Sequence, residues 1–184
     1  FFLFFVRFQL DEKGVPIGIV VKESKESHQL IEEFMLLANR TVAENIAKQH
    51  INKKPIPFPY RVHDQPDEEK LAPFIQYAKR YGHSFDISTP QAIAHSFNGM
   101  LADAHGKPEQ HVLEQLGIRT MAKAIYTPEN IGHYGLAFEH YCHFTSPIRR
   151  YPDVLVHRVL QTVLDGASLI DKKLIEKSYH SSER

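Results

Sequence analysis

Two adjacent arginines, Arg149 and Arg150, follow a short polar stretch in the segment HFTSPIRRYPD. Thr145 or Ser146 can cap a helix there, and Pro147 then occupies the first helical position, where its missing N–H costs nothing. The free N–H groups of a helix start favour anions, and guanidinium donors match phosphate oxygens. The segment therefore predicts an anion-binding site at the N-terminus of a helix. The alternative is a capped surface helix with solvated arginines.

The helix predicted after this segment adds two charged residues near the arginine pair. Asp153 lies four residues after Arg149, so the two side chains can pair on one helix face. Arg158 lies further along and could extend the basic surface. Apolar residues continue the helix to Asp165 and Gly166, where the glycine ends it.

A second charged pair, Glu32 and Glu33, lies on a long helix predicted between about residues 24 and 49. Glu33 falls on the flank of an apolar stripe and Glu32 nearly opposite it, so Glu33 could reach into a cleft. The alternative is that both glutamates are exposed and favour the helix dipole. The stripe itself is assigned to the core, and its members are Leu30, Ile31, Phe34, Leu37, Ala38, Val42 and Ile46.

Aromatic residues and glycines alternate in IYTPENIGHYGLAF, residues 125–138, which predicts a short strand and close backbone approaches. His133 and Tyr134 could stack on a base or a sugar. The alternative is that Tyr134 and Phe138 belong to the core.

No metal site is predicted from the histidines. His140 and His143 flank Cys142, but the chain has no second ligand pair at the spacing of a structural zinc site. His63 and Asp64 form a dipeptide found in metal phosphohydrolases, yet nothing else of such a site is present. Both are interpreted as loop residues.

The composition is that of an ordinary soluble globular protein. Of the 184 residues, 42% are hydrophobic and 24% charged, and Lys+Arg equals Asp+Glu at 22 each. A global basic field is therefore absent, and any nucleic-acid binding must come from local patches. The single cysteine, Cys142, excludes an internal disulfide and fits a reducing, cytoplasmic compartment.

The first ten residues are apolar but too short to span a bilayer, and we interpret them as a buried strand or an artificial chain boundary. The chain also begins without Met, which favours a fragment.

Local patterns predict an α/β chain that is mostly helical, with an N-terminal β-hairpin and a short strand near 125–138. Two β-branched runs separated by a glycine-bearing turn predict the hairpin. Proline and glycine signals delimit the helices that follow. The predicted elements are strands over 6–10 and 17–21, the long helix, an extended connector over 53–60, helices over 67–81, 89–104 and 106–124, the strand, the helix after the arginines, and a final helix over 169–184.

The segment HFTSPIRRYPDVLVHR resembles the signature of the RNB catalytic domain of the ribonuclease II / ribonuclease R exoribonuclease family. Three further segments agree in the same order: LIEEFMLLANRTVAENI, RVHDQPDEEKL and IRTMAKAIYTPENIGHYGLAF. The resemblance covers about residues 20–164, and this combination of segments resembles bacterial ribonuclease R more than ribonuclease II.

This resemblance implies an enzyme that degrades RNA processively from the 3′ end to nucleoside 5′-monophosphates, with Mg²⁺ held by a cluster of aspartates. Arg149 matches the arginine that contacts the phosphate near the scissile bond, and Arg150 is its neighbour. Glu32 and Glu33 match the acidic position near the terminal nucleotide, where Glu33 is favoured. Three residues match motif positions without an assigned role: Thr145, Ser146 and Tyr134.

One departure from the family pattern decides what the chain is expected to do alone. The family's aspartate cluster lies upstream of every matched segment, and this chain has no closely spaced Asp-x-Asp-Asp group. Two-metal hydrolysis needs several carboxylates. Residues 1–184 are therefore expected to be the C-terminal part of one RNB domain, without Mg²⁺ ligands, cold-shock domains or an S1 domain, and inactive alone.

Single-stranded RNA is the expected partner, and neither DNA nor a membrane is. The apolar chain start favours self-association of such a fragment. A non-catalytic RNA-binding or scaffold module is the alternative, and a helical protein without a nucleic-acid role is a third possibility.

Overall fold

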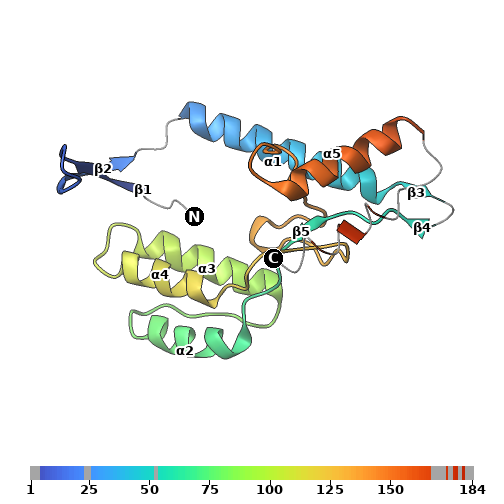
Figure 1. Cartoon of the computed structure of the whole chain (residues 1–184). Helices are drawn as coiled ribbons and strands as arrows, with labels where there is room; N and C mark the ends of the chain where they lie inside the picture. Colours follow the sequence, from blue (N-terminus) through green and yellow to red (C-terminus); the bar gives the residue numbers. More distant parts are fainter. Residues whose placement is uncertain are drawn as a thin grey trace. The chain divides into compact units, whose positions relative to one another are not determined.

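The computed structural model describes residues 5–22, 26–51 and 54–166, together with 173, 176, 177 and 180. The chain divides into two compact units, Phe1–Ala38 and Asn39–Arg184 (Figure 1). Helix α1 (Glu26–Ala47) begins in the first unit and ends in the second. The final helix predicted over 169–184 lies largely outside the described residues.

The first unit contains a β-hairpin whose strands β1 (Phe5–Leu10) and β2 (Pro16–Lys22) pair antiparallel. Asp11 shapes the turn, because its Oδ1 accepts the backbone N–H of Val15 at 2.8 Å. Gly14 adopts φ +79°, a left-handed conformation that costs glycine little. The predicted hairpin is therefore confirmed.

Large apolar side chains of the first unit are exposed, which contradicts two predictions. Phe8 and Leu10 of β1 are 58% and 57% exposed, so the described end of the chain start is not a buried strand. The apolar stripe of α1 is also exposed over its first part, by 57–59% at Leu30, Ile31, Phe34 and Leu37. Core packing explains the stripe only from the second unit onward, where Ile46 is 1% exposed.

The first core of the second unit joins the end of α1 to strand β5 (Tyr60–Val62) and helix α5 (Tyr151–Leu164). Strand β5 begins at Tyr60, the last residue of the predicted extended connector, and pairs antiparallel with strand β6 (Ile125–Thr127). A two-residue pair, β3 (His50–Ile51) with β4 (Lys54–Pro55), precedes it. The buried members of this core are Ala43, Ile46, Ile56, Phe58, Tyr60, Val62, Cys142, Leu155, Val156 and Val159.

The second core lies among helices α2 (Glu68–Lys79), α3 (Pro90–Ala104) and α4 (Gln110–Thr120), which lie side by side (Figure 1). Asp67 caps α2 by accepting the Glu69 N–H at 3.1 Å, and Thr89 caps α3 by accepting that of Ala92 at 3.1 Å. Both starts were predicted from the sequence and are confirmed.

Helix α4 ends four residues earlier than predicted and runs without interruption through Gly117. The end is fixed by a distant contact, because the Thr120 carbonyl accepts the backbone N–H of Asp67 at 3.0 Å. Gly117 allows close packing, since an added Cβ would lie 3.2 Å from the Phe97 ring.

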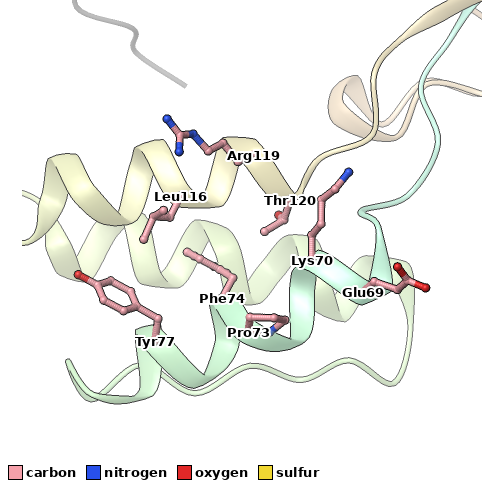
Figure 2. A pocket seen from close by; sticks show the side chains of 8 residues that line it. All are labelled: Glu69, Lys70, Pro73, Phe74, Tyr77, Leu116, Arg119 and Thr120. Atoms are coloured by element: carbon pink, nitrogen blue, oxygen red, sulfur yellow. The ribbon is translucent and has the colours of Figure 1, made fainter.

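A cavity of about 440 Å³ opens beside α2 and α4, with Phe74, Pro73 and Leu116 among its apolar lining (Figure 2). Lys70 and Arg119 lie at its edges. None of the residues predicted to contact RNA lines it.

The mixed α/β class, mostly helical with small antiparallel sheets, is as predicted. The strand expected over 125–138 is shorter, because only Ile125–Thr127 pairs and a 3₁₀ turn, η1 (Tyr134–Leu136), follows. Within the described part of the chain, no helix is both long and apolar enough to cross a bilayer.

Candidate functional site

Helix α5 does not begin at the predicted place. It starts at Tyr151, and residues 147–149 form a turn in which the Ser146 carbonyl accepts the N–H groups of Arg149 at 3.3 Å and Arg150 at 3.2 Å. A helix starting at Pro147 would carry Pro152 in its sixth position, where its ring would clash with the carbonyl four residues earlier. The prediction that Thr145 or Ser146 caps this helix is therefore wrong.

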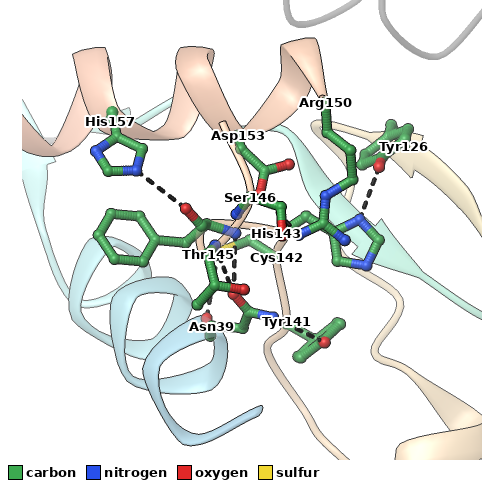
Figure 3. Close-up of polar contacts among 11 residues, drawn as sticks. Asn39, Tyr126, Tyr141, Cys142, His143, Thr145, Ser146, Arg150, Asp153 and His157 are labelled. Atoms are coloured by element: carbon green, nitrogen blue, oxygen red, sulfur yellow. Dashed lines mark hydrogen bonds and ion pairs between the residues drawn. The ribbon is translucent and has the colours of Figure 1, made fainter. Parts of the chain in front are cut away.

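The predicted pair of Arg149 with Asp153 is also wrong, because Arg150 takes that place. Asp153 is 0% exposed, and its Oδ1 accepts Arg150 Nη2 at 2.8 Å and the backbone N–H of Ser146 at 2.8 Å (Figure 3). The four-residue spacing rule applies only within a helix, and Arg149 precedes the first helical turn. Asp153 thus anchors both ends of the turn.

Arg149 is left as the unpaired cation of the turn. Its side chain is exposed, and its guanidinium has no hydrogen-bond or ion-pair partner among the described residues. The neighbouring Ile148 is 102% exposed, so the tip of the turn projects into solvent. The geometry makes Arg149 available to an anion, while Arg150 is partly neutralised by Asp153.

The other predicted contact residues have different surroundings. Thr145 Oγ1 is buried without a partner in the described part of the chain, and Ser146 is half-buried. Arg158 is exposed on α5. The Tyr134 hydroxyl donates to the Pro90 carbonyl at 3.0 Å, which ties η1 to the start of α3. This contact favours a structural role for Tyr134.

Glu32 and Glu33 lie on the part of α1 that belongs to the first unit, and both are exposed. This exposure is compatible with both interpretations: the two glutamates could contact RNA, or they could be solvated residues near a helix start. Their place near a terminal nucleotide stays a prediction.

A polar network below the turn was not predicted from the sequence. The Tyr126 hydroxyl and His143 Nδ1 share a hydrogen bond of 2.7 Å, and the Arg61 guanidinium lies 4.6 Å from the Tyr126 ring centroid. Burial lowers the pKa of His143 to about 4, with the Arg150 cation acting in the same direction. His143 is therefore neutral near pH 7 and adds no charge to the site.

His63 is more than a loop residue. Its Nδ1 accepts the Gly135 N–H at 2.9 Å and its Nε2 donates to the Ala122 carbonyl at 2.9 Å, which fixes one neutral tautomer. Its ring lies 5.1 Å from that of His133, whose pKa is lowered to about 4 by burial. These contacts join three segments that are distant in sequence.

The sequence did not lead us to Asn39, although its side chain and backbone carbonyl form hydrogen bonds with four residues of the segment 141–145 that precedes the turn. A polar residue four positions before buried Ala43 and seven before buried Ile46 was the available signal, because that spacing places it on the buried face. Asn39 is itself 3% exposed.

The described residues do not fit a Mg²⁺ site. No three His, Cys, Asp or Glu side chains lie close enough to hold a metal ion within the described ranges. The buried carboxylate of Asp153 already accepts from a guanidinium, which repels a second cation.

The exposed guanidinium of Arg149, on a turn that Asp153 anchors, has donors that match the oxygens of a phosphate or a carboxylate. The chain belongs to the RNB domain family, whose model matches residues 3–166. The predicted family resemblance is thereby confirmed.

Similar proteins carry the name ribonuclease R. The chain is 41% identical over 167 residues to Ribonuclease R of Aquifex aeolicus, a match that covers 90% of this chain and 23% of that protein. It is similar to Mycoplasma genitalium RNase R in complex with ribose methylated single-stranded RNA, with a TM-score of 0.81 and 29% identity over 98% of this chain and 28% of that one. The chain thus spans about a quarter of the length of these relatives.

A second similar structure is that of yeast Ssd1, which is described as a pseudonuclease. The TM-score is 0.70 and the identity 28%, over 88% of this chain and 19% of that one. The fold therefore occurs both in ribonucleases and in a protein described as a pseudonuclease.

Proposed function

We propose that this chain is part of the catalytic domain of an exoribonuclease that hydrolyses single-stranded RNA from the 3′ end to nucleoside 5′-monophosphates. The single observation that carries the proposal is Arg149, an exposed guanidinium on a turn that Asp153 anchors. Membership of the RNB family and similarity to an RNase R in complex with single-stranded RNA support it.

Arg149 would bind a phosphate near the scissile bond. A guanidinium offers paired donors to phosphate oxygens and places a fixed positive charge where negative charge develops in the transition state. Loss of such a contact raises the barrier by about 2–4 kcal/mol, or about 10²–10³ in rate.

The remaining predicted contacts belong to the same proposal. Arg158 would extend the basic surface along α5, and Arg150 would act through the turn that it shares with Asp153. Glu33, with Glu32 as the second choice, would lie near the terminal nucleotide. Three residues would line the RNA path without a separate role: Tyr134, Thr145 and Ser146.

Mg²⁺ and its aspartate ligands would come from sequence outside this chain, because the residues described here do not fit such a site. The bound metal would supply the activated water. We therefore propose that the isolated chain binds RNA and does not cleave it. A cytoplasmic location suits the single thiol, Cys142, which is fully buried and whose pKa burial raises.

A non-catalytic RNA-binding module is the second candidate. The similarity to Ssd1, described as a pseudonuclease, favours it, because that protein has the fold of this chain. A cleavage assay separates the two candidates.

The test compares Arg149→Ala with the wild type in the longer protein that the proposal implies. Arg80→Ala is the matched control, because Arg80 is also exposed and lies at the end of α2. We expect Arg149→Ala to lower turnover of single-stranded RNA by about 10²–10³ and the control to leave it unchanged. Full turnover by Arg149→Ala would remove this residue from the mechanism, and RNA binding without any cleavage by the wild type would favour the second candidate.

A further inference from the structure

Asn39 contacts the backbone of the segment that leads into the arginine turn. Its Oδ1 accepts the N–H of Phe144 at 2.9 Å and that of Thr145 at 3.2 Å (Figure 3). These are main-chain contacts, so they fix the path of the chain and not merely the direction of a side chain.

The other polar groups of Asn39 bind the same segment. Its Nδ2 donates to the Tyr141 hydroxyl at 3.0 Å, and its backbone carbonyl accepts the Cys142 thiol at 3.2 Å. The two N–H groups that face Oδ1 determine which end of the amide is oxygen, because an NH₂ group there could not accept them. Every side-chain polar atom of this buried asparagine is thus used on residues 141–145.

The arginine turn is therefore anchored from two helices. Asn39 of α1 fixes the chain up to Thr145, and Asp153 of α5 fixes Ser146 and Arg150. Between these anchors lie only residues 147–149, and Arg149 is the last of them.

We propose that Asn39 is a positioning residue, which sets the backbone of the turn so that Arg149 meets the RNA phosphate. This inference rests on the proposed function, because it assigns to Asn39 an effect that is transmitted through Arg149. An asparagine that served stability alone would affect RNA binding only as far as it affects folding.

The first test measures hydrogen exchange at the Phe144 and Thr145 amides in the 184-residue chain without RNA. We expect both amides to be protected in the wild type. In Asn39→Ala they should exchange at least about tenfold faster, which corresponds to the loss of about 1.4 kcal/mol of protection. In Asn39→Asp they should stay within about threefold of the wild type, because a carboxylate oxygen accepts the same two N–H groups.

The second test is a double-variant cycle on the affinity for a single-stranded RNA oligonucleotide. Asn39→Ala and Arg149→Ala should each weaken binding by about tenfold, and the double variant should bind no more weakly than Arg149→Ala alone. Ile93→Val controls for stability, because it trims a buried side chain of the second core and should leave affinity unchanged.

Unprotected Phe144 and Thr145 amides in the folded wild type would overturn the inference, whether or not Asn39→Ala folds. So would additive losses in the cycle, or an equal loss of affinity in Ile93→Val. If the wild-type chain binds no RNA at all, the proposed function fails and this inference fails with it. If the two affinity losses are additive while the wild-type chain binds RNA normally, only the inference about Asn39 fails and the proposed function stands.

Discussion

Replacement of Asp153 should destabilise the second unit in a graded way. Its carboxylate is 0% exposed, and one oxygen accepts both Arg150 Nη2 and the Ser146 N–H, each at 2.8 Å. Asp153→Ala removes the acceptor of the half-buried Ser146 N–H and of the Arg150 guanidinium, which is only partly exposed. Removal of one partner of such a buried pair costs about 3–5 kcal/mol.

Asp153→Asn should cost less, because its Oδ1 still accepts both donors and only the charge is lost. Hydrogen bonds to charged groups contribute about 1.5–3 kcal/mol and neutral ones about 0.5–1.5 kcal/mol, so the bond from the Ser146 N–H loses about 1 kcal/mol, whereas the bond from Arg150 still has a charged donor. The other carboxylate oxygen, Oδ2, has no partner among the described residues, so the new NH₂ group displaces no hydrogen bond there.

The assay is urea unfolding of the 184-residue chain, followed by circular dichroism, with the free energy of unfolding as the measured quantity. Asp165→Asn is the control, because Asp165 is exposed and its side chain accepts from Gln161 alone among the described residues; its effect should stay within about 0.5 kcal/mol. An Asp153→Ala variant as stable as this control would refute the view that Asp153 anchors the turn.

Three further outcomes are expected. Gly135→Ala should lower the free energy of unfolding by about 1–3 kcal/mol in urea titrations, because the new Cβ would lie 2.9 Å from His63 Nδ1; an unchanged midpoint would contradict the packing. Burial lowers the pKa values of His133 and His143 to about 4 in the folded chain, whereas both are about 6.5 in the unfolded chain. Below about pH 6.5 the unfolded chain therefore binds more protons than the folded chain. The free energy of unfolding should fall as the pH is lowered from about 6.5 to about 4, and these two histidines should not change it above about pH 6.5. A profile that is flat down to pH 4 would contradict this sign. Phe34→Glu should reduce self-association in sedimentation velocity, because Phe34 is 59% exposed. A wild-type chain that is already monomeric would contradict the expectation that this apolar surface causes self-association.

Elements with local signals were predictable from the sequence. The turn around Gly14 determined the hairpin, and Thr89 with Pro90 marked the start of α3 before any tertiary contact was known. The arginine pair was also recognised as the centre of the candidate site. In each case the deciding interactions lie within a few residues of one another.

One error has a local cause that the sequence already contained, because Pro152 lies five residues after Pro147 and forbids the earlier helix start. The other errors arose where distant contacts decide the local structure. The end of α4 depends on Asp67, which lies more than fifty residues earlier. Asn39 has partners about a hundred residues later, so its role could not follow from spacing along one helix.

The exposed stripe on the first part of α1 has a related physical cause. Periodicity predicts which face of a helix is apolar, but it does not predict what covers that face. Phe34 and Leu37 belong to the stripe and are exposed in the described structure, whereas Ile46 is buried by β5 and α5 residues of the same core.

The salt dependence of RNA affinity tests the central claim most directly. The isolated chain is titrated with a single-stranded oligonucleotide at several salt concentrations, as wild type, Arg149→Ala and the Arg80→Ala control. If Arg149 contacts a phosphate, its removal should weaken binding and lower the slope of log affinity against log salt by about 0.7, the value for one contact on a single strand. Equal affinity and equal slope for the wild type and Arg149→Ala would contradict a phosphate contact at this turn.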